Sequence, residues 1–174
     1  MAAKASAEKA ALDQWYCIDN LADIPLGVSA NRLLGVDLTV TRGEGIAVMA
    51  EGRALPTRQR YGYLWVTLGE ALPEVPPIPE ADEPDRRYVP CGAIAVKASG
   101  LRIVENFLDM AHFPFVHTDI LGSEPHTEVE HYDCEIRRDV DEVWATNCTF
   151  VQPKAALSAG GAIKTDYIYR ITTP

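Results

Sequence analysis

The 174-residue sequence contains no apolar run long enough to span a bilayer, although 47% of its residues are hydrophobic. Its first twelve residues also lack the apolar stretch of a secretory signal. Lysine and arginine number 16, against 25 aspartate and glutamate residues, so the formal net charge is -9. Because binding to nucleic acid depends on basic side chains, this balance argues against a nucleic-acid partner. We expect a cytoplasmic protein with no membrane partner.

Cysteine and histidine are scarce, and each occurs four times. The cysteines lie far apart, without a C-x-x-C or C-x-H pair, so their spacing signals neither a zinc ribbon nor an iron–sulfur cluster. They stand at Cys17, Cys91, Cys134 and Cys148. In a cytosolic chain we interpret them as free thiols. The four histidines, by contrast, all fall between His112 and His131.

The first half of the chain favours short strands followed by a connector. β-Branched and partly alternating residues predict strands over 33–41, 45–49 and 61–68. Residues 72–90 hold six of the twelve prolines together with five acidic residues. Because proline disrupts both helices and central strands, we expect an extended, solvated connector there.

The second half begins with a possible strand over 93–97 and a helix over 101–111, whose apolar residues recur at helical spacing. Ser99 is a candidate N-cap, and Pro114 predicts that the helix ends or kinks at residue 113. Strands are predicted over 127–137, 142–151 and 163–172, as an antiparallel meander. Pro174 follows the last strand directly, so we expect a domain interrupted partway.

The segment that contains His112 and His117 is the main candidate for a functional site. His112 and His117 lie close to the carboxylates of Glu105 and Asp109, and two imidazoles near carboxylates can capture a divalent iron or zinc ion. Asp109 precedes His112 by three residues, so on a helix its carboxylate could accept a hydrogen bond from the imidazole nitrogen that does not bind metal. Asn106 could line the site or form a structural hydrogen bond.

The segment Glu105 to His117 resembles the mononuclear iron motif of Rieske-type non-haem iron oxygenases, E-N-x-x-D-x-x-H-x-x-x-x-H. All five fixed positions match. The resemblance implies that His112 and His117 bind Fe(II), and that a distant aspartate, absent from this chain, completes the ligand set. It also implies that Asp109 carries electrons from the cluster of a neighbouring subunit. Asp109 and Asn106 are therefore the candidate catalytic residues.

Weaker matches outside the motif follow the order of the family. Trp15-Tyr16, Leu33-Leu34-Gly35 and the segment 61–66 resemble its N-terminal Rieske domain, and the prolines resemble the bridge to its catalytic domain. The resemblance implies an α+β fold in which 1–13 is a tail and 14–70 a Rieske-like β segment without cluster ligands. Residues 71–90 would form the linker, and 91–174 the first part of a helix-grip catalytic domain.

Two departures from the family pattern concern metal ligands. Residues 50–60, where the family carries C-x-H and C-x-x-H pairs, contain no cysteine or histidine, so we expect no [2Fe-2S] cluster bound by this chain. An external Rieske protein or ferredoxin, with a reductase, would then supply the electrons. The third iron ligand is also missing, and Glu124, Glu128 and Glu130 are weak substitutes because each reads as a solvated residue. We expect either a longer gene product or a truncated copy.

The leading hypothesis is a terminal oxygenase component, commonly trimeric in the family, that uses Fe(II) and dioxygen to hydroxylate or demethylate a small aromatic or heterocyclic compound. One alternative is a non-catalytic or truncated subunit that pairs with a complete oxygenase. A zinc hydrolase could use the same imidazoles.

Several further residues allow two interpretations. Phe113, Phe115 and Val116 could wall the iron site or pack in a core. The cluster of Arg53, Arg58 and Arg60 could meet an acidic electron donor or protect a strand edge. His126 and His131 are five apart in a predicted strand, on opposite faces, so we leave them out of the site.

Overall fold

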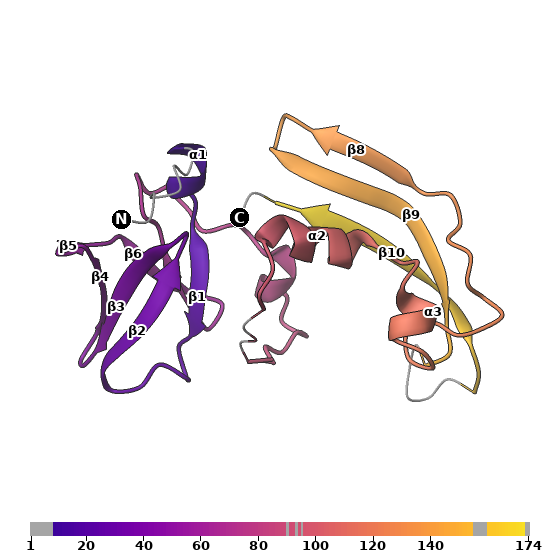
Figure 1. Cartoon of the computed structure of the whole chain (residues 1–174), viewed down its shortest axis with the longest axis horizontal. Coiled ribbons are helices and arrows are strands. Elements are labelled where there is room, and N and C mark those ends of the chain that lie inside the picture. Colours follow the sequence, from indigo (N-terminus) through magenta and orange to yellow (C-terminus); the bar gives the residue numbers. More distant parts are fainter. Residues whose placement is uncertain (1–8, 90, 93, 95, 155–159, 173–174) are drawn as a thin grey trace. The chain divides into compact units, whose positions relative to one another are not determined.

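The computed structural model describes residues 9–89, 91–92, 94, 96–154 and 160–172. The chain divides into two compact units, residues 1–95 (unit 1) and 96–173 (unit 2), which are described one at a time (Figure 1). The regular secondary structure is mostly antiparallel β-sheet, with few helices. No helix in these residues is long and apolar enough to cross a membrane.

Unit 1 consists of short strands in two antiparallel sheets, with strand orders β1-β7-β6 and β2-β3-β4-β5. Its elements are α1 (Lys9–Leu12), β1 (Tyr16–Asn20), β2 (Gly27–Leu33), β3 (Val36–Arg42), β4 (Ile46–Ala50), β5 (Arg53–Ala54), β6 (Thr57–Arg60), β7 (Tyr63–Val66) and the 3-10 helix η1 (Pro79–Asp82). Alternate residues of these strands, including Leu38, Val40, Val48, Leu64 and Val66, form one core.

Two tight turns of unit 1 lie within ranges that were predicted to be strand. Leu34 and Gly35 have φ of 47° and 82° between β2 and β3, so the strand prediction over 33–41 is wrong at this point. Two consecutive residues of positive φ form a type I′ turn, which matches the twist of a hairpin. Tyr61 and Gly62, with φ of 57° and 81°, join β6 and β7 in the same way. Each turn sets the register of its hairpin.

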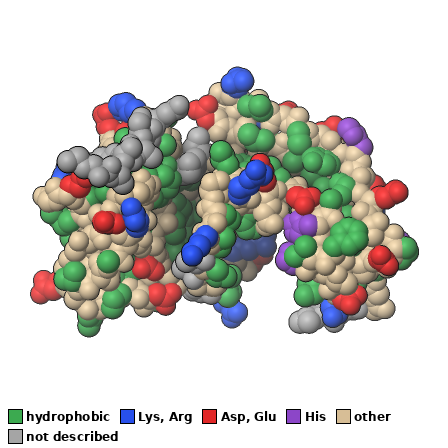
Figure 2. All heavy atoms as spheres, in the orientation of Figure 1, with side chains coloured by type: hydrophobic (Ala, Val, Ile, Leu, Met, Phe, Trp, Pro, Cys, Tyr) green, Lys and Arg blue, Asp and Glu red, His purple; other side chains and the backbone are tan. Residues whose placement is uncertain are grey.

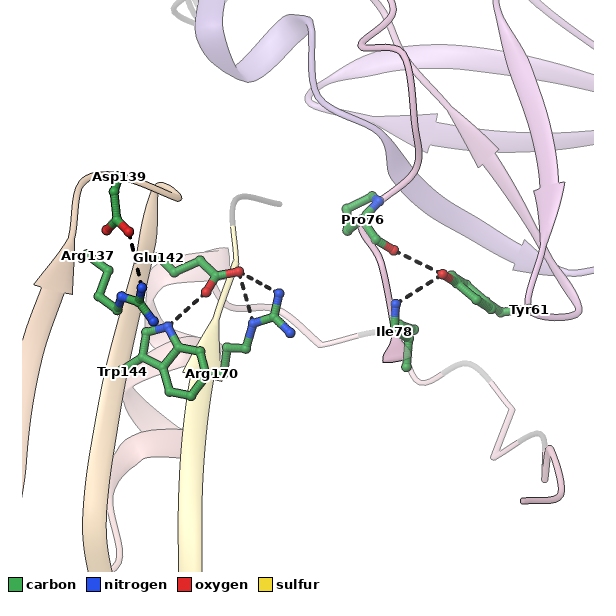
Figure 3. Close-up of polar contacts among 8 residues, drawn as sticks. All are labelled: Tyr61, Pro76, Ile78, Arg137, Asp139, Glu142, Trp144 and Arg170. Carbon is green, nitrogen blue, oxygen red and sulfur yellow. Dashed lines mark hydrogen bonds and ion pairs between the residues drawn. The ribbon is translucent and has the colours of Figure 1, made fainter. Parts of the chain in front are cut away.

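The proline-rich connector is mostly exposed, as expected, but it is also attached to unit 1. Val75 is only 2% exposed. The Tyr61 hydroxyl donates to the carbonyl of Pro76 at 3.4 Å and accepts from the backbone N–H of Ile78 at 3.0 Å (Figure 3). These contacts hold the segment after Val75 beside the β6–β7 turn.

Unit 2 contains α2 (Gly100–Leu108), α3 (Phe113–Val116), β8 (Asp133–Arg137), β9 (Glu142–Gln152) and β10 (Ile163–Ile171). The predicted meander is confirmed, because β9 pairs antiparallel with both β8 and β10 (Figure 1). The first of its strands begins at residue 133 rather than 127. The strand prediction over 93–97 falls partly on residues 93 and 95, which lie outside the described residues.

A β-bulge interrupts the alternation of β9. Tyr167 pairs with Cys148, but Tyr169 pairs with Ala145, so Thr146 and Asn147 together face one residue of β10. Asn147 takes a φ of 57°, and its side chain donates to Asp133 at 2.7 Å. The extra residue lets Ala145 and Cys148, three apart, face the same core.

At the start of β9, the Glu142 carboxylate connects two strands of the sheet. Glu142 accepts from the Trp144 indole N–H at 2.8 Å and from the Arg170 guanidinium of β10 (Figure 3). The guanidinium carbons of Arg137 and Arg170 lie 5.6 Å and 5.7 Å from the centre of the Trp144 ring. The cluster therefore includes side chains from all three strands.

Candidate metal centre

Helix α2 ends earlier than the sequence predicted. Ser99 is its N-cap, as expected, and accepts from the backbone N–H of Arg102 at 3.4 Å. The helix stops at Leu108 because Asp109 has an extended ψ of 114° and its carboxylate accepts from the backbone N–H of Ala111 at 2.8 Å. A side chain that binds the backbone two residues ahead competes with the helical ladder. The prediction of a helix through residue 111 is therefore wrong.

Pro114 begins a helix instead of ending one. It lies in the first turn of α3, where its missing N–H costs nothing because the helical ladder needs no donor there. His112 is the N-cap residue of this single turn, and His117 is its C-cap residue. The two histidines of the motif thus flank one helical turn.

The imidazoles of His112 and His117 lie close together. Their ring centroids are 5.1 Å apart, with 61° between the ring planes. Two imidazole nitrogens that each lie about 2 Å from one ion place their ring centres on the order of 5 Å apart, so the spacing fits a shared cation. The His112 Nδ1 atom lies 3.0 Å from the Asp109 carboxylate, which leaves its Nε2 atom for an ion.

The chain around the histidines is held by the core of unit 2. Met110 and Phe113 are 2% and 7% exposed, and the Phe113 ring meets Phe150 edge-on at 5.5 Å. After the helical turn, the Thr118 hydroxyl donates to the carbonyl of Pro114 at 2.6 Å. The His117 carbonyl accepts from the backbone N–H groups of residues 120 and 121. The backbone on both sides of the pair is therefore fixed.

Gly122 packs directly beneath α3. A Cβ atom at this position would lie 2.8 Å from the backbone nitrogen of Pro114 and 2.9 Å from the Phe150 ring. Real Cβ contacts are never this short, so the position requires glycine. The loop after His117 can approach the helical turn because residue 122 has no side chain.

Two tyrosines that the sequence analysis did not single out lie in the same core. The rings of Tyr167 and Tyr169 stack at 5.9 Å, and Tyr167 lies 6.2 Å from the Phe113 ring. Burial raises the pKa of Tyr169 to about 12, and the charge of Asp109 adds to that rise. Both phenols are therefore protonated at neutral pH. Their i, i+2 spacing in a strand is the signal that could have placed them on one face.

The structure places most of the remaining candidates at the surface, with Phe113 as the exception. Asn106 is exposed on α2 and makes no hydrogen bond with its side chain among the described residues. Glu105 pairs with Arg102. Of the aromatic wall, Phe113 packs in the core, while Phe115 and Val116 are 64% and 69% exposed. The visible face of unit 2 shows histidine side chains beside hydrophobic ones (Figure 2).

The structure does not favour any of the glutamates that were considered as substitutes for the third iron ligand. The Glu130 carboxylate is 2.7 Å from the Lys164 ammonium and 3.2 Å from the Thr149 hydroxyl, and these hydrogen bonds lower its pKa. Among the residues that the structure describes, no group of three or more His, Cys, Asp or Glu side chains gathers closely enough to hold a metal ion. The geometry therefore offers a two-histidine part of a metal centre.

The basic cluster of unit 1 is engaged within the unit. Arg53 donates to the carbonyl of Leu68 at 2.8 Å, Arg58 lies 5.4 Å over the Trp15 ring, and Arg60 lies 4.7 Å over the Tyr61 ring. Cation–π and backbone contacts thus account for all three guanidinium groups. The four cysteines are free, as predicted.

Comparisons with known proteins agree with the motif. Residues 96–171 match the family of vanillate O-demethylase oxygenase C-terminal domains. A probable methylxanthine N7-demethylase, NdmC, from Pseudomonas sp. (strain TJI-51) is 47% identical over 167 residues, which cover 94% of this chain and 59% of the relative. A chloroplastic chlorophyllide a oxygenase from Chlamydomonas reinhardtii is 37% identical over 68 residues, covering 37% of this chain and 10% of that protein.

The family match and the Pseudomonas relative support a member of the Rieske-type oxygenase family. It spans 59% of the length of the Pseudomonas relative. Within this chain, the histidine pair and the tyrosines lie inside the region that matches the oxygenase C-terminal domain. The alignment with the Pseudomonas relative also extends well into unit 1, because it covers 94% of the chain.

Proposed function

We propose that this chain belongs to a terminal oxygenase in which His112 and His117 hold a mononuclear Fe(II) ion. The observation that carries the proposal is the 5.1 Å separation of the two rings on either side of α3, with Asp109 hydrogen-bonded to His112. When bound, the ion would supply the activation of dioxygen that side chains cannot perform. Asp109 would fix the tautomer and orientation of His112.

The proposed reaction is removal of a methyl group from a small aromatic or heterocyclic substrate. Both a family of O-demethylase domains and an N-demethylase relative support demethylation over ring hydroxylation. With two electrons from the donor protein and two protons from solvent, one oxygen atom of dioxygen would be inserted into a C–H bond of the methyl group, and the other would be released as water. The hydroxymethyl group would then leave as formaldehyde, and the heteroatom would keep a proton.

The electrons would come from a separate protein. Residues 50–60 include β5 and β6 and hold no cysteine or histidine, so they offer no ligand for a [2Fe-2S] cluster. An external Rieske or ferredoxin protein with its reductase would fill this role. We also propose that the protein acts as an oligomer in the cytoplasm.

Iron content tests the proposal. The chain is loaded with Fe(II) under anaerobic conditions, and bound iron is measured by elemental analysis and by the EPR signal of its nitric oxide adduct. We expect binding by the parent chain and a loss of at least about tenfold in affinity for His112→Ala and for His117→Ala, since changes one shell further out already cost roughly 10- to 100-fold. His126→Ala and His131→Ala are matched controls and should leave binding unchanged.

Two outcomes would contradict the proposed oxygenase function. If the parent chain binds no iron, a non-catalytic subunit that pairs with a complete oxygenase becomes the better explanation. If zinc occupies the site and supports hydrolysis without dioxygen or reductant, the protein is a hydrolase. If the proposed demethylation is correct, the amount of formaldehyde released in a reconstituted reaction should equal the amount of dioxygen consumed.

A further inference from the structure

Strand β7 of unit 1 is apolar on its outer face, where a solvated strand would be polar, whereas the facing residues of β6 are Arg58 and Arg60. Leu64 and Val66 are fully buried in the core, so the alternation of β7 places Tyr63 and Trp65 on the opposite face. Cys17 of β1 lies directly across from Trp65. A strand that is apolar on both faces is typical of a sheet covered on both sides.

The connector forms a wall beside this face without covering it. The Tyr61 hydroxyl holds Pro76 and Ile78, as Figure 3 shows. The Tyr88 hydroxyl donates to the carbonyl of Ala81 at 3.0 Å, which folds the end of the segment back on η1. Ile78 and Tyr88 nevertheless remain 43% and 53% exposed.

The groove between the sheet and the connector has a volume of about 510 Å³. This volume falls within the roughly 300–1,000 Å³ that small-molecule sites occupy. Its apolar lining comes mainly from Cys17, Tyr61, Tyr63, Trp65, Ile78 and Tyr88. Four aromatic rings around one groove favour a flat, aromatic occupant.

The charged residues that line the groove bear on the charge of its ligand. Arg86 is held by Glu83 at 2.6 Å and lies 3.7 Å from Asp85. Arg87 also lines the groove, and among the described residues it makes no ion pair. Glu80 contributes one carboxylate to the lining, yet no ion pair joins it to Arg87. A guanidinium beside an apolar groove matches a carboxylate, which it can bind through two parallel hydrogen bonds.

We propose that this groove binds a planar aromatic carboxylate, with its ring against Tyr63, Trp65 and Tyr88 and its carboxylate on Arg87. The site lies wholly within unit 1 and uses none of the metal-site residues. It is therefore independent of the proposed oxygenase function, and either can fail alone.

Calorimetric titration of the full chain with 2-naphthoate tests the site. We expect one saturable site, and at least about tenfold weaker binding of the neutral analogue 2-naphthalenemethanol, because the charge-assisted contact is lost. Arg87→Gln should weaken naphthoate binding by a similar factor. Arg32→Gln, at another exposed arginine of unit 1, is the matched control and should bind like the parent.

Location is tested separately by alkylation. Naphthoate should slow the modification of Cys17, measured by mass spectrometry, while Cys91 and Cys134 react at unchanged rates. The His112→Ala variant should bind naphthoate like the parent. Equal affinity for the neutral analogue, no effect of Arg87→Gln, or loss of binding in His112→Ala would each overturn the proposal.

Discussion

Asp109 is the residue with the most roles in the candidate metal centre. One oxygen of its carboxylate accepts from the Ala111 N–H and ends α2, and the other lies 3.0 Å from His112 Nδ1. The first contact sets where the chain leaves the helix, and the second sets how the imidazole turns. A single side chain thus couples local backbone geometry to the orientation of a metal ligand.

Two substitutions of Asp109 separate these roles. Asp109→Asn keeps an oxygen for the Ala111 N–H but replaces the charged acceptor of the imidazole proton, so we expect roughly 10- to 100-fold weaker iron binding with little change in unfolding free energy. Asp109→Ala removes both contacts and should also lower that free energy by about 1 kcal/mol. Iron titration and urea unfolding measure the two effects. Equal stability loss in both variants would argue against the two-role assignment.

The surroundings of Glu142 predict that the fold is sensitive to acid. The Arg170 guanidinium and the Trp144 indole hold the pKa of this carboxyl below its ordinary value of 4.5. Because the folded state then binds fewer protons than the unfolded state, the stabilisation is present above the ordinary pKa and is lost as pH falls through the lowered value.

We therefore expect Glu142→Gln to lower the urea midpoint near neutral pH and to reduce its further loss below about pH 4. Glu44→Gln, an exposed glutamate in a turn of unit 1, serves as the control and should follow the parent at every pH. If the midpoints of parent and Glu142→Gln fall in parallel as pH is lowered, Glu142 does not contribute to the acid sensitivity.

At the scale of elements, α3 depends on the close approach of the loop that follows it. Gly122 has the Pro114 backbone and the Phe150 ring within 3 Å of where a Cβ would stand. Neither a backbone atom nor a core ring can move freely, so any side chain at this position must displace the helical turn between the two histidines.

Gly122→Ala should lower the unfolding free energy by about 1–3 kcal/mol and weaken iron binding at the same time. Gly100→Ala is the matched control, because a Cβ there meets nothing within 4 Å and alanine favours the helix. Thermal unfolding and iron titration test both variants. Parent-like iron affinity in Gly122→Ala would show that α3 is not held by this contact.

At the scale of the whole molecule, each unit has a core of its own. Leu64 is fully buried among the strands of unit 1, whereas Phe150 is 3% exposed in the core that holds Met110 and Phe113. Loss of a core side chain costs the free energy of transfer and of the cavity that remains.

We expect Leu64→Ala to destabilise unit 1 by about 2–5 kcal/mol and Phe150→Ala to destabilise unit 2 by about 3–5 kcal/mol. Hydrogen exchange read by mass spectrometry should show faster exchange in β1 and β7 for the first variant and in β9 and β10 for the second. Faster exchange in the strands of both units from either substitution would contradict separate cores.

Much of the secondary structure and of the candidate site could be predicted from the sequence, because these features depend on local patterns. The antiparallel meander, the Ser99 cap and the motif with its two histidines follow from alternation, capping chemistry and fixed spacing. The turn at Leu34 and Gly35 was missed because hydrophobic residues continue through it. The late start of β8 could not be predicted, since strand ends depend on which partner is present.

The sequence by itself determined which residues are available for chemistry: two imidazoles, a carboxylate three residues before the first of them, and no cysteine or histidine in residues 50–60. Only the tertiary structure decided that Pro114 opens a helical turn, that Gly122 packs under it, and that the rings of His112 and His117 come within 5.1 Å. The reason is physical: residue types and spacing are local properties, whereas the direction of a side chain depends on packing against segments distant in the chain.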